Sequence, residues 1–158
     1  MKRHTFRRWL YRGRRPNWLA QVMIRVDAAV SSTGITAKYG AVTLDVTGRI
    51  SGRTISLPLV MVVVDGERYL ASMLGDDVQW VKNVRAAAGR AVLRSGRREE
   101  VRLEEVPADR RAPILRIYLQ HAPGARAHIP VDKDAPLSAF ERIASAYPVF
   151  HIVSAAPV

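Results

Sequence analysis

The residues most suited to chemistry form a short basic stretch that contains two glycines, GRISGR, at positions 48–53. Gly48 and Gly52 are expected to leave backbone N–H groups exposed in a turn, and Arg49 and Arg53 follow them at the same spacing. Such a turn can bind a phosphate or a carboxylate. The stretch is neither a P-loop nor a dinucleotide fingerprint, because it lacks a Gly-Lys-Ser/Thr ending and leads into a strand-like run. An anion site is one interpretation, and a plain glycine-rich turn is the other.

Few other residues suggest catalysis without a cofactor. The chain has no cysteine, which excludes disulfides, thiol nucleophiles and cysteine-based metal sites. Its four histidines do not fall at the spacing of metal ligands, and no Gly-x-Ser-x-Gly arrangement is present. Carboxylates in the stretches 65–72 and 99–105 alternate along predicted strands and are expected on a solvated face. If the protein is an enzyme, a bound cofactor must supply the reactive atom.

The charge of the chain favours an anionic partner. Lys and Arg number 25 and Asp and Glu number 14 among 158 residues, which gives a formal net charge of +11. Phosphate, nucleic acid and lipid headgroups all fit this charge. Residues 1–18 form a basic arm without an acidic residue, in which Phe6, Trp9 and Tyr11 are interleaved with arginines. This combination suits an anionic membrane surface and also nucleic acid.

The segment after the arm shows helical spacing of apolar residues from about residue 17 to residue 30. An amphipathic helix is predicted there, which either covers one end of the core or contacts a membrane. Arg25 and Asp27 interrupt its apolar positions, so it does not resemble a signal peptide. The longest apolar run, at 57–64, is far shorter than the roughly 20 residues of a spanning helix. A cytoplasmic location is expected, either free or peripheral on the inner face of the cell membrane.

The remaining chain reads as strands with helices at intervals. Strand patterns occupy 41–46, 54–64, 68–73, 90–95, 99–106 and 147–153, with hairpin turns at Asp65–Gly66 and Ser95–Gly96. Helical patterns occupy 76–89, 109–124 and 136–146; Asp76 or Asp77 is the expected N-cap of the first, and Gly89 its end. This order predicts a mainly β, α+β fold, an antiparallel barrel with helical decoration. We expect an arm and amphipathic helix at 1–35 and a cofactor-binding barrel domain at 36–158.

Three separated pieces carry a family resemblance: TGRISGRTISLPL, DGERYLASM and WVKNVRA. In this order they resemble the deazaflavin-dependent nitroreductase and quinone reductase family of actinobacteria. The resemblance implies a split β-barrel related to the flavin-mononucleotide-binding barrels. It also implies an oxidoreductase that uses reduced coenzyme F-420, an 8-hydroxy-5-deazaflavin, to transfer a hydride to a quinone, a nitroaromatic compound or an activated enone.

Carried over by position, the resemblance implies a cofactor site made from four segments. The acidic tail of the cofactor is expected at Gly48, Arg49 and Ile50, and its ring along Thr54, Ile55, Ser56, Leu57, Pro58 and Leu59, mainly through backbone amides. The other side is expected to be closed by Leu70, Ala71, Ser72 and Met73 and by Gln79, Trp80, Val81, Lys82 and Asn83. Trp80 is expected to flank the cofactor or to anchor the core, and both roles can hold at once; Asn83 is expected to pin its helix.

Departures from the family pattern leave alternatives open. Ile50 and Met73 are apolar where the family often has basic residues, which favours an apolar acceptor. The proton donor is expected to be water, His128 or Tyr118, the last two being candidate substrate contacts. Flavin mononucleotide or haem in the same barrel is one alternative, and a non-enzymatic basic module that binds membrane or nucleic acid is another. Specific nucleic-acid binding is not expected, an oligomer is compatible with the sequence, and no metal site is predicted.

Overall fold

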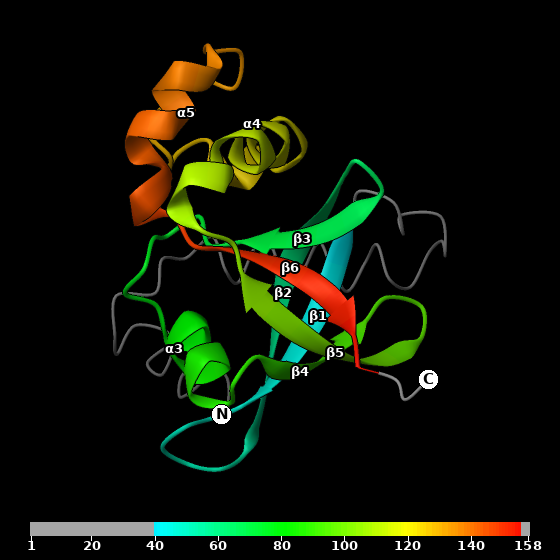
Figure 1. Ribbon diagram of the computed structural model, residues 1–158. Helices are drawn as coiled ribbons and strands as arrows, with labels where there is room; N and C mark the ends of the chain where they lie inside the picture. The colour runs from blue at the N-terminus through cyan, green and yellow to red at the C-terminus, as the bar shows by residue number, and fades with distance from the viewer. Residues whose placement is uncertain (1–39, 156–158) are drawn as a thin grey trace, which may run out of the picture.

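Six antiparallel strands form a closed barrel in the computed structural model, which describes residues 40–155 (Figure 1). The strands are β1 (Ala41–Thr47), β2 (Thr54–Val64), β3 (Glu67–Ala71), β4 (Arg90–Arg94), β5 (Arg98–Glu105) and β6 (Val149–Ser154). Their order around the barrel is β1-β2-β3-β6-β5-β4, and β4 pairs with β1 to close it. That closing seam contains three residue pairs, from Thr43↔Arg94 to Asp45↔Val92. The predicted mainly β, split-barrel fold is confirmed.

The barrel interior is built from alternate residues of each strand. Val42, Leu44 and Val46 of β1 are almost fully buried, and their partners on β2 are Leu59, Leu57 and Ile55. Helix α3 (Gln79–Ala86) closes one end, because Val81 and Val84 belong to the same core cluster. The half-buried ring of Trp80 packs against Phe150, with centroids 5.5 Å apart. The Trp80 side chain therefore packs against the core inside the barrel.

The opposite end of the barrel is filled by an ion pair. Arg68 of β3 lies on the same side of its strand as the buried Leu70, and Glu99 of β5 lies on the same side as the buried Val101. Two hydrogen bonds of 2.8 and 2.9 Å join the Arg68 guanidinium to the Glu99 carboxylate. The expectation that the carboxylates of 99–105 face solvent is thus wrong for Glu99, because alternation along β5 places it on the inner side, where it meets Arg68.

Helices cover the outer face of β2 and β3, on the side away from α3 (Figure 1). They are α4 (Ala112–His121) and α5 (Leu137–Ile143), with the short 3-10 turns η1 (Ala108–Arg110), η2 (Pro123–Ala125) and η3 (Ala144–Ala146). Outward-facing Val62 and Ala71 pack with Leu115, Leu119 and Phe140 in a second buried cluster. The barrel therefore has one core inside and a second core under its helical cover.

Several predicted boundaries are corrected by the structure. The third strand ends at Ala71 and not at residue 73, and the helix predicted at 76–89 is limited to Gln79–Ala86. Neither Asp76 nor Asp77 caps it, since the N-cap is Val78 and makes no side-chain hydrogen bond. The two carboxylates pair instead with cations on the helix, Asp76 with Arg85 at 2.6 Å and Asp77 with Lys82.

Other predicted features are confirmed or fall outside the described chain. The hairpin at Asp65–Gly66 has positive φ at both residues, 52° and 79°, which a two-residue turn of this kind requires. The helix predicted at 109–124 begins with η1 and continues as α4, with Pro113 in its first turn. The basic arm and the amphipathic helix predicted at 1–35 lie outside the described residues. Within residues 40–155, no helix has the length and apolar character needed to cross a membrane.

Candidate functional site

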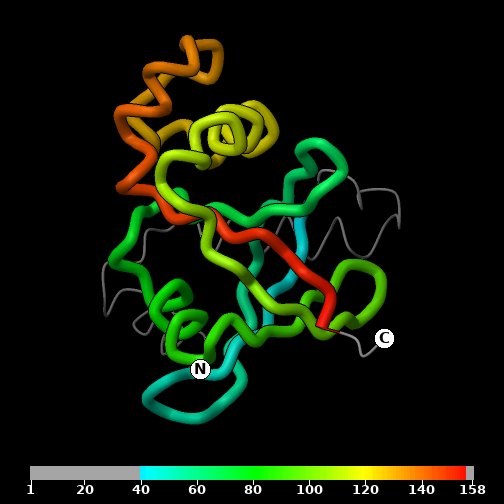
Figure 2. Tube along the Cα trace, viewed as in Figure 1, coloured from blue at the N-terminus to red at the C-terminus, as the bar shows by residue number. Residues whose placement is uncertain are grey.

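The basic turn between β1 and β2 projects beyond the barrel beside α3 (Figure 2). Its backbone N–H groups are largely used inside the protein: Gly48 donates to the Arg53 carbonyl at 2.8 Å and Gly52 to the Gly48 carbonyl at 2.8 Å. The Arg53 N–H reaches Ser51 Oγ at 3.2 Å. The expectation that Gly48 and Gly52 expose their N–H groups to an anion is therefore wrong, because the turn folds back on itself. Any anion binding by this turn falls to its arginine side chains.

Arg49 joins the turn to helix α3. Its backbone N–H and its Nη1 both donate to Oδ1 of Asn83, at 3.1 and 2.9 Å, and its Nη2 donates to Oε1 of Gln79 at 2.9 Å. Asn83 is 2% exposed. Both partners are neutral amides, so these contacts leave the positive charge of Arg49 without a compensating carboxylate. The structure thus brings three predicted site residues from two segments into direct contact.

Gly48 is closely packed at the base of the turn. A Cβ at this position would lie 2.8 Å from Ser51 Oγ and 2.9 Å from Ile55 Cδ1. Both atoms are ends of side chains, so a Cβ here would first displace these side chains; the nearest backbone atom is the Arg53 carbonyl oxygen, at 3.3 Å. The glycine lets the chain reverse directly above the first residues of β2.

One edge of β2 is unpaired along the segment where the ring was predicted. Residues Thr54 to Val60 pair with β1, whereas β3 pairs only with Met61 to Val64. Between residues 40 and 155, no strand therefore lies against the second edge of 54–59. This is the place where the barrel is split.

The direction of the backbone groups at this edge follows from two hydrogen bonds. Gly48 N–H donates to the Arg53 carbonyl and Met61 N–H donates to the Gly40 carbonyl, so odd-numbered residues of β2 bond toward β1. Because backbone groups alternate along a strand, the even-numbered residues turn theirs to the unpaired edge. Thr54 and Ser56 thus present N–H and C=O groups there. Pro58 has no N–H and sits at an edge, where a strand tolerates proline.

The Ser56 side chain is fixed on the outer face of the barrel by residues that the sequence analysis did not single out. Ser56 Oγ donates to Asp45 Oδ1 at 2.6 Å, and Arg94 holds the same carboxylate with bonds of 2.9 and 3.0 Å. Burial raises the pKa of Asp45, but the hydrogen bonds from Arg94 and Ser56 outweigh it, and the pKa lies below its usual value. Asp45 therefore stays ionised, and its contact with Ser56 depends on a β1–β2 register that sequence patterns do not reveal.

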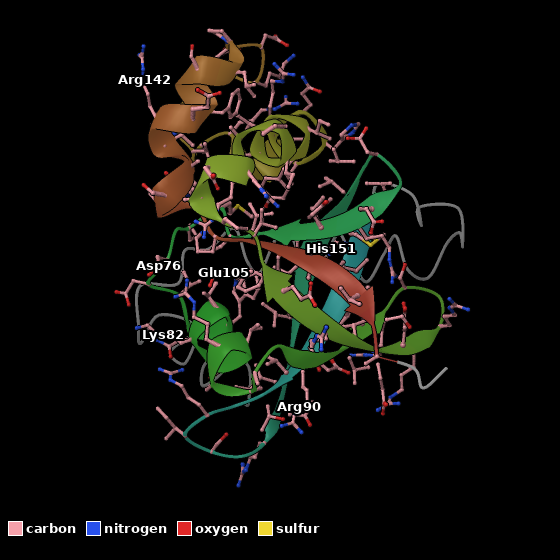
Figure 3. The ribbon with its side chains drawn as sticks, viewed as in Figure 1. Asp76, Lys82, Arg90, Glu105, Arg142 and His151 are labelled. Carbon is pink, nitrogen blue, oxygen red and sulfur yellow. The ribbon has the colours of Figure 1, made fainter. Side chains whose placement is uncertain are left out.

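A groove of about 480 Å³ runs along this outer face from Thr54 of β2 across β1 and β4 to β5. Two arginines line it, Arg90 and Arg98, together with Asp45 and Glu100. Figure 3 shows Arg90 and Lys82 on the side of the barrel away from Arg142 of α5. The charges of the groove lining are thus balanced, and the groove begins close to the basic turn.

The other predicted segments contribute mainly to the core. Leu70, Ala71, Ser72 and Val81 are at most 3% exposed. The Ser72 hydroxyl donates to the Gly75 carbonyl at 2.6 Å, which shapes the loop before α3. Leu57 and Leu59 face the barrel interior, Met73 packs half-buried under the helical cover, and Lys82 pairs with Asp77. These residues support the site through the backbone and through packing.

The two candidate proton donors lie under or beside the helical cover. Tyr118 of α4 is 2% exposed, and burial raises the pKa of its hydroxyl above the usual value. It is a core residue in this structure, so the sequence-based suggestion that it contacts substrate is corrected. His128 follows η2 and is half-buried; its carbonyl accepts a hydrogen bond from the Tyr147 hydroxyl at 3.1 Å. Its role as a donor stays a prediction.

Charged residues also tie α3 to the barrel. Arg85 donates to Asp76 at 2.6 Å and to Glu105 at 2.5 Å, and Glu105 lies 3.7 Å from Arg111. Hydrogen bonding to Arg85 lowers the pKa of Asp76 despite some desolvation. Figure 3 shows Asp76 and Glu105 on the side of the barrel that carries α3. The helix that closes the barrel is thus held at both ends, by Arg49 and by Arg85.

Comparisons with known proteins agree with this architecture. A family model described as F-420H(2)-dependent quinone reductase matches residues 18–139. No curated protein gives a significant match. Among solved structures, a protein of unknown function from Agrobacterium tumefaciens has a TM-score of 0.57 at 10% identity and is matched over 82% of this chain. The chain spans about half of that protein's length, 55%.

Two further solved structures are named as reductases. One, titled F-420 reductase, has a TM-score of 0.50 at 11% identity over 77% of this chain and 91% of its own. The other, a reductase dependent on reduced coenzyme F-420 (FDR-A), has a TM-score of 0.50 at 18% identity over 71% of this chain and 92% of its own. At these identities the likeness shows a shared fold.

Proposed function

Because the chain belongs to the F-420H(2)-dependent quinone reductase family, we propose that it binds reduced coenzyme F-420 along the unpaired edge of β2 and uses it to reduce a quinone-like acceptor. Members of this family are oxidoreductases whose cofactor is coenzyme F-420. The observation that carries the proposal for this chain is the edge at residues 54–58, whose backbone groups are left outside the barrel ladder directly beside a turn with two arginines.

The donors at this edge fit the ring of the coenzyme. Thr54 and Ser56 present backbone N–H groups, and a deazaflavin ring carries carbonyl oxygens that accept such bonds. Pro58 presents no N–H at the same edge, which limits the donors to the first half of the segment. The residues present therefore fit the group.

The charges around the turn fit its acidic tail. Arg49 is held in place by Gln79 and Asn83, and Arg53 is exposed on the same turn. The groove on the outer face begins at Thr54 and continues past Arg90. Guanidinium groups bind carboxylates and phosphates with charge-assisted hydrogen bonds. We assign the tail to this basic side of the barrel.

When bound, reduced coenzyme F-420 supplies a hydride to an electron-poor acceptor. The chain contributes binding, orientation and exclusion of water. The fixed β2 edge orients the ring, and the contact between Arg49 and α3 holds the turn at a constant distance from the closed end of the barrel. Because Tyr118 is buried, we assign the proton that completes the reduction to water, with His128 as the residue to test.

The acceptor that we propose is apolar and membrane-soluble. Of the two apolar departures from the family pattern, Met73 packs under the helical cover and Ile50 is exposed in the turn, and burial of apolar surface contributes about 25 cal/mol per Å². The basic arm at residues 1–35 would bring the protein to the anionic inner face of the cell membrane, where such an acceptor is dissolved. Flavin mononucleotide in the same barrel is the alternative cofactor.

A fluorescence titration with oxidised coenzyme F-420 tests the assignment. Arg53→Glu should weaken binding by roughly tenfold or more, because one attraction of about 1 kcal/mol is replaced by a repulsion. Arg142→Glu is the matched control, an exposed arginine on α5 on the other side of the barrel. Equal affinities of the two variants would contradict the placement of the tail. Failure of the parent protein to bind the coenzyme, with binding of flavin mononucleotide, would contradict the cofactor.

The acceptor is tested by following oxidation of the reduced coenzyme by absorbance. A menaquinone analogue and a polar nitro compound are compared at matched concentrations, and the menaquinone analogue should react faster. Oxidation with the polar compound alone would reject an apolar acceptor while leaving the cofactor assignment intact.

A further inference from the structure

Ile50 is the one large apolar side chain that is strongly exposed among residues 40–155, at 88%. It lies in the turn at 48–53, which extends beyond the barrel beside α3 (Figure 2). Single exposed apolar residues are common on protein surfaces. Exposure alone therefore does not indicate that Ile50 binds anything, and the neighbouring side chains and backbone are the relevant evidence.

The side chains around Ile50 are basic. Arg49 precedes it and Arg53 follows in the same turn, and no acidic residue occurs between positions 46 and 64. Arg90 lies on this side of the barrel as well, and so does Lys82, which pairs with Asp77 (Figure 3). An apolar tip with flanking arginines matches an anionic lipid surface, because the apolar group reaches the acyl boundary while the guanidinium groups stay among the headgroups.

The backbone of the turn is prepared for such an environment. Within the described residues, the N–H groups of Gly48, Arg49, Gly52 and Arg53 have acceptors inside the protein, and those of Ile50 and Ser51 at the tip do not. A polar backbone group that loses water without a partner is costly, so internal hydrogen bonds lower the cost of moving the turn into a headgroup layer. The contact of Arg49 with α3 also orders the turn in advance, which reduces the entropy lost on binding.

We propose that the turn at 48–53 is a membrane-docking element that places Ile50 in the interface of an anionic lipid layer. The docking element extends the membrane location proposed above and rests on it. The test of the docking element does not depend on the coenzyme, because vesicle binding is measured without coenzyme. Docking at this turn would place the unpaired edge of β2, which begins at Thr54, next to the lipid.

Site-specific labelling gives a local readout, because the natural chain has no cysteine. Ile50→Cys and Ser138→Cys are each made in the full chain and labelled with an environment-sensitive dye. Ser138 is exposed on α5, on the other side of the barrel from the turn. Vesicles of phosphatidylcholine with phosphatidylglycerol should shift the emission at position 50 to the blue and leave position 138 unchanged. No shift at 50, or equal shifts at both positions, overturns the proposal.

A second pair of variants keeps the label out of the experiment. Ile50→Ser should reduce sedimentation with the same anionic vesicles several-fold, whereas Ile50→Leu should retain it, since the turn and its charges are unchanged in both. Equal sedimentation of the two variants means that the basic arm alone carries the protein to lipid and overturns a role of the turn. A blue shift at position 50 caused equally by heparin would assign the turn to soluble polyanions instead of lipid.

Discussion

Removal of the Asn83 side chain should separate the basic turn from α3. In Asn83→Ala the turn loses the acceptor of two hydrogen bonds, one from the Arg49 backbone N–H at 3.1 Å and one from its guanidinium at 2.9 Å. A neutral hydrogen bond contributes about 1 kcal/mol to stability and one from a charged group about 1.5–3 kcal/mol. In the variant, water can replace part of the hydrogen bond made by the Arg49 guanidinium, because this contact is only partly buried. The free energy of unfolding should therefore fall by about 2–3 kcal/mol.

Urea unfolding at neutral pH measures this loss, with the slope of the transition as the check that the folded state stays compact. Gln79→Ala is the matched control, because it removes the exposed third bond of the same arginine and should cost less than about 0.5 kcal/mol. Arg49→Ala combined with Asn83→Ala in a double-mutant cycle isolates the side-chain contact, and a coupling energy of about 1 kcal/mol or more is expected. Equal small losses in Asn83→Ala and Gln79→Ala, or no coupling, would refute the view that Asn83 anchors the turn.

Two further predictions concern the barrel itself. Hydrogen bonding to Arg68 lowers the pKa of Glu99 although burial opposes it, so the ion pair adds stability above the usual carboxyl pKa that is lost as the pH falls through the lowered value. Glu99→Gln should therefore be less stable at neutral pH and lose less stability on acidification, and parallel pH profiles of the melting temperature would disprove this. Gly89→Ala should destabilise by about 3 kcal/mol or more, because its Cβ would lie 2.4 Å from the Leu103 carbonyl oxygen at a φ of 82°. Gly96→Ala, with a φ of 75° and open space, should cost only about 1–2 kcal/mol in the same denaturation assay.

Local patterns in the sequence were sufficient for the strands and their turns. The alternation of Val42, Leu44 and Val46 with polar residues is visible in seven consecutive residues and predicts which face of β1 is buried. The pair Asp65–Gly66 favours a hairpin turn by its own residue types. The family resemblance selected a segment of β2 that proves to have an unpaired edge. Each of these features depends on a few consecutive residues, so it could be predicted from the sequence alone.

Features that depend on strand register or on distant partners were not readable. The N–H groups of Gly48 and Gly52 looked available because their acceptors are formed only when the turn closes. Alternation along β5 puts Glu99 on the face of Val101 and Leu103, but its partner Arg68 lies two strands away, so the ion pair that keeps it there was not visible in the sequence. Tyr118 looked available as a donor, whereas the packing of α4 on β2 and β3 buries it. In each case a tertiary contact overrides the local preference.

The place of β6 in the barrel has a consequence for how the chain folds. β6 is the last strand in sequence, yet it lies between β3 and β5, so that Tyr69 pairs with His151 and Leu103 with Ile152. Until β6 arrives, both β3 and β5 present an unpaired edge, which other chains can pair with. The pairing of β3 with β6 closes a long loop, and such distant contacts form slowly. While β6 has not emerged from the ribosome, the nascent chain can form at most an open five-stranded sheet, and we expect competition from aggregation to be most severe at that stage.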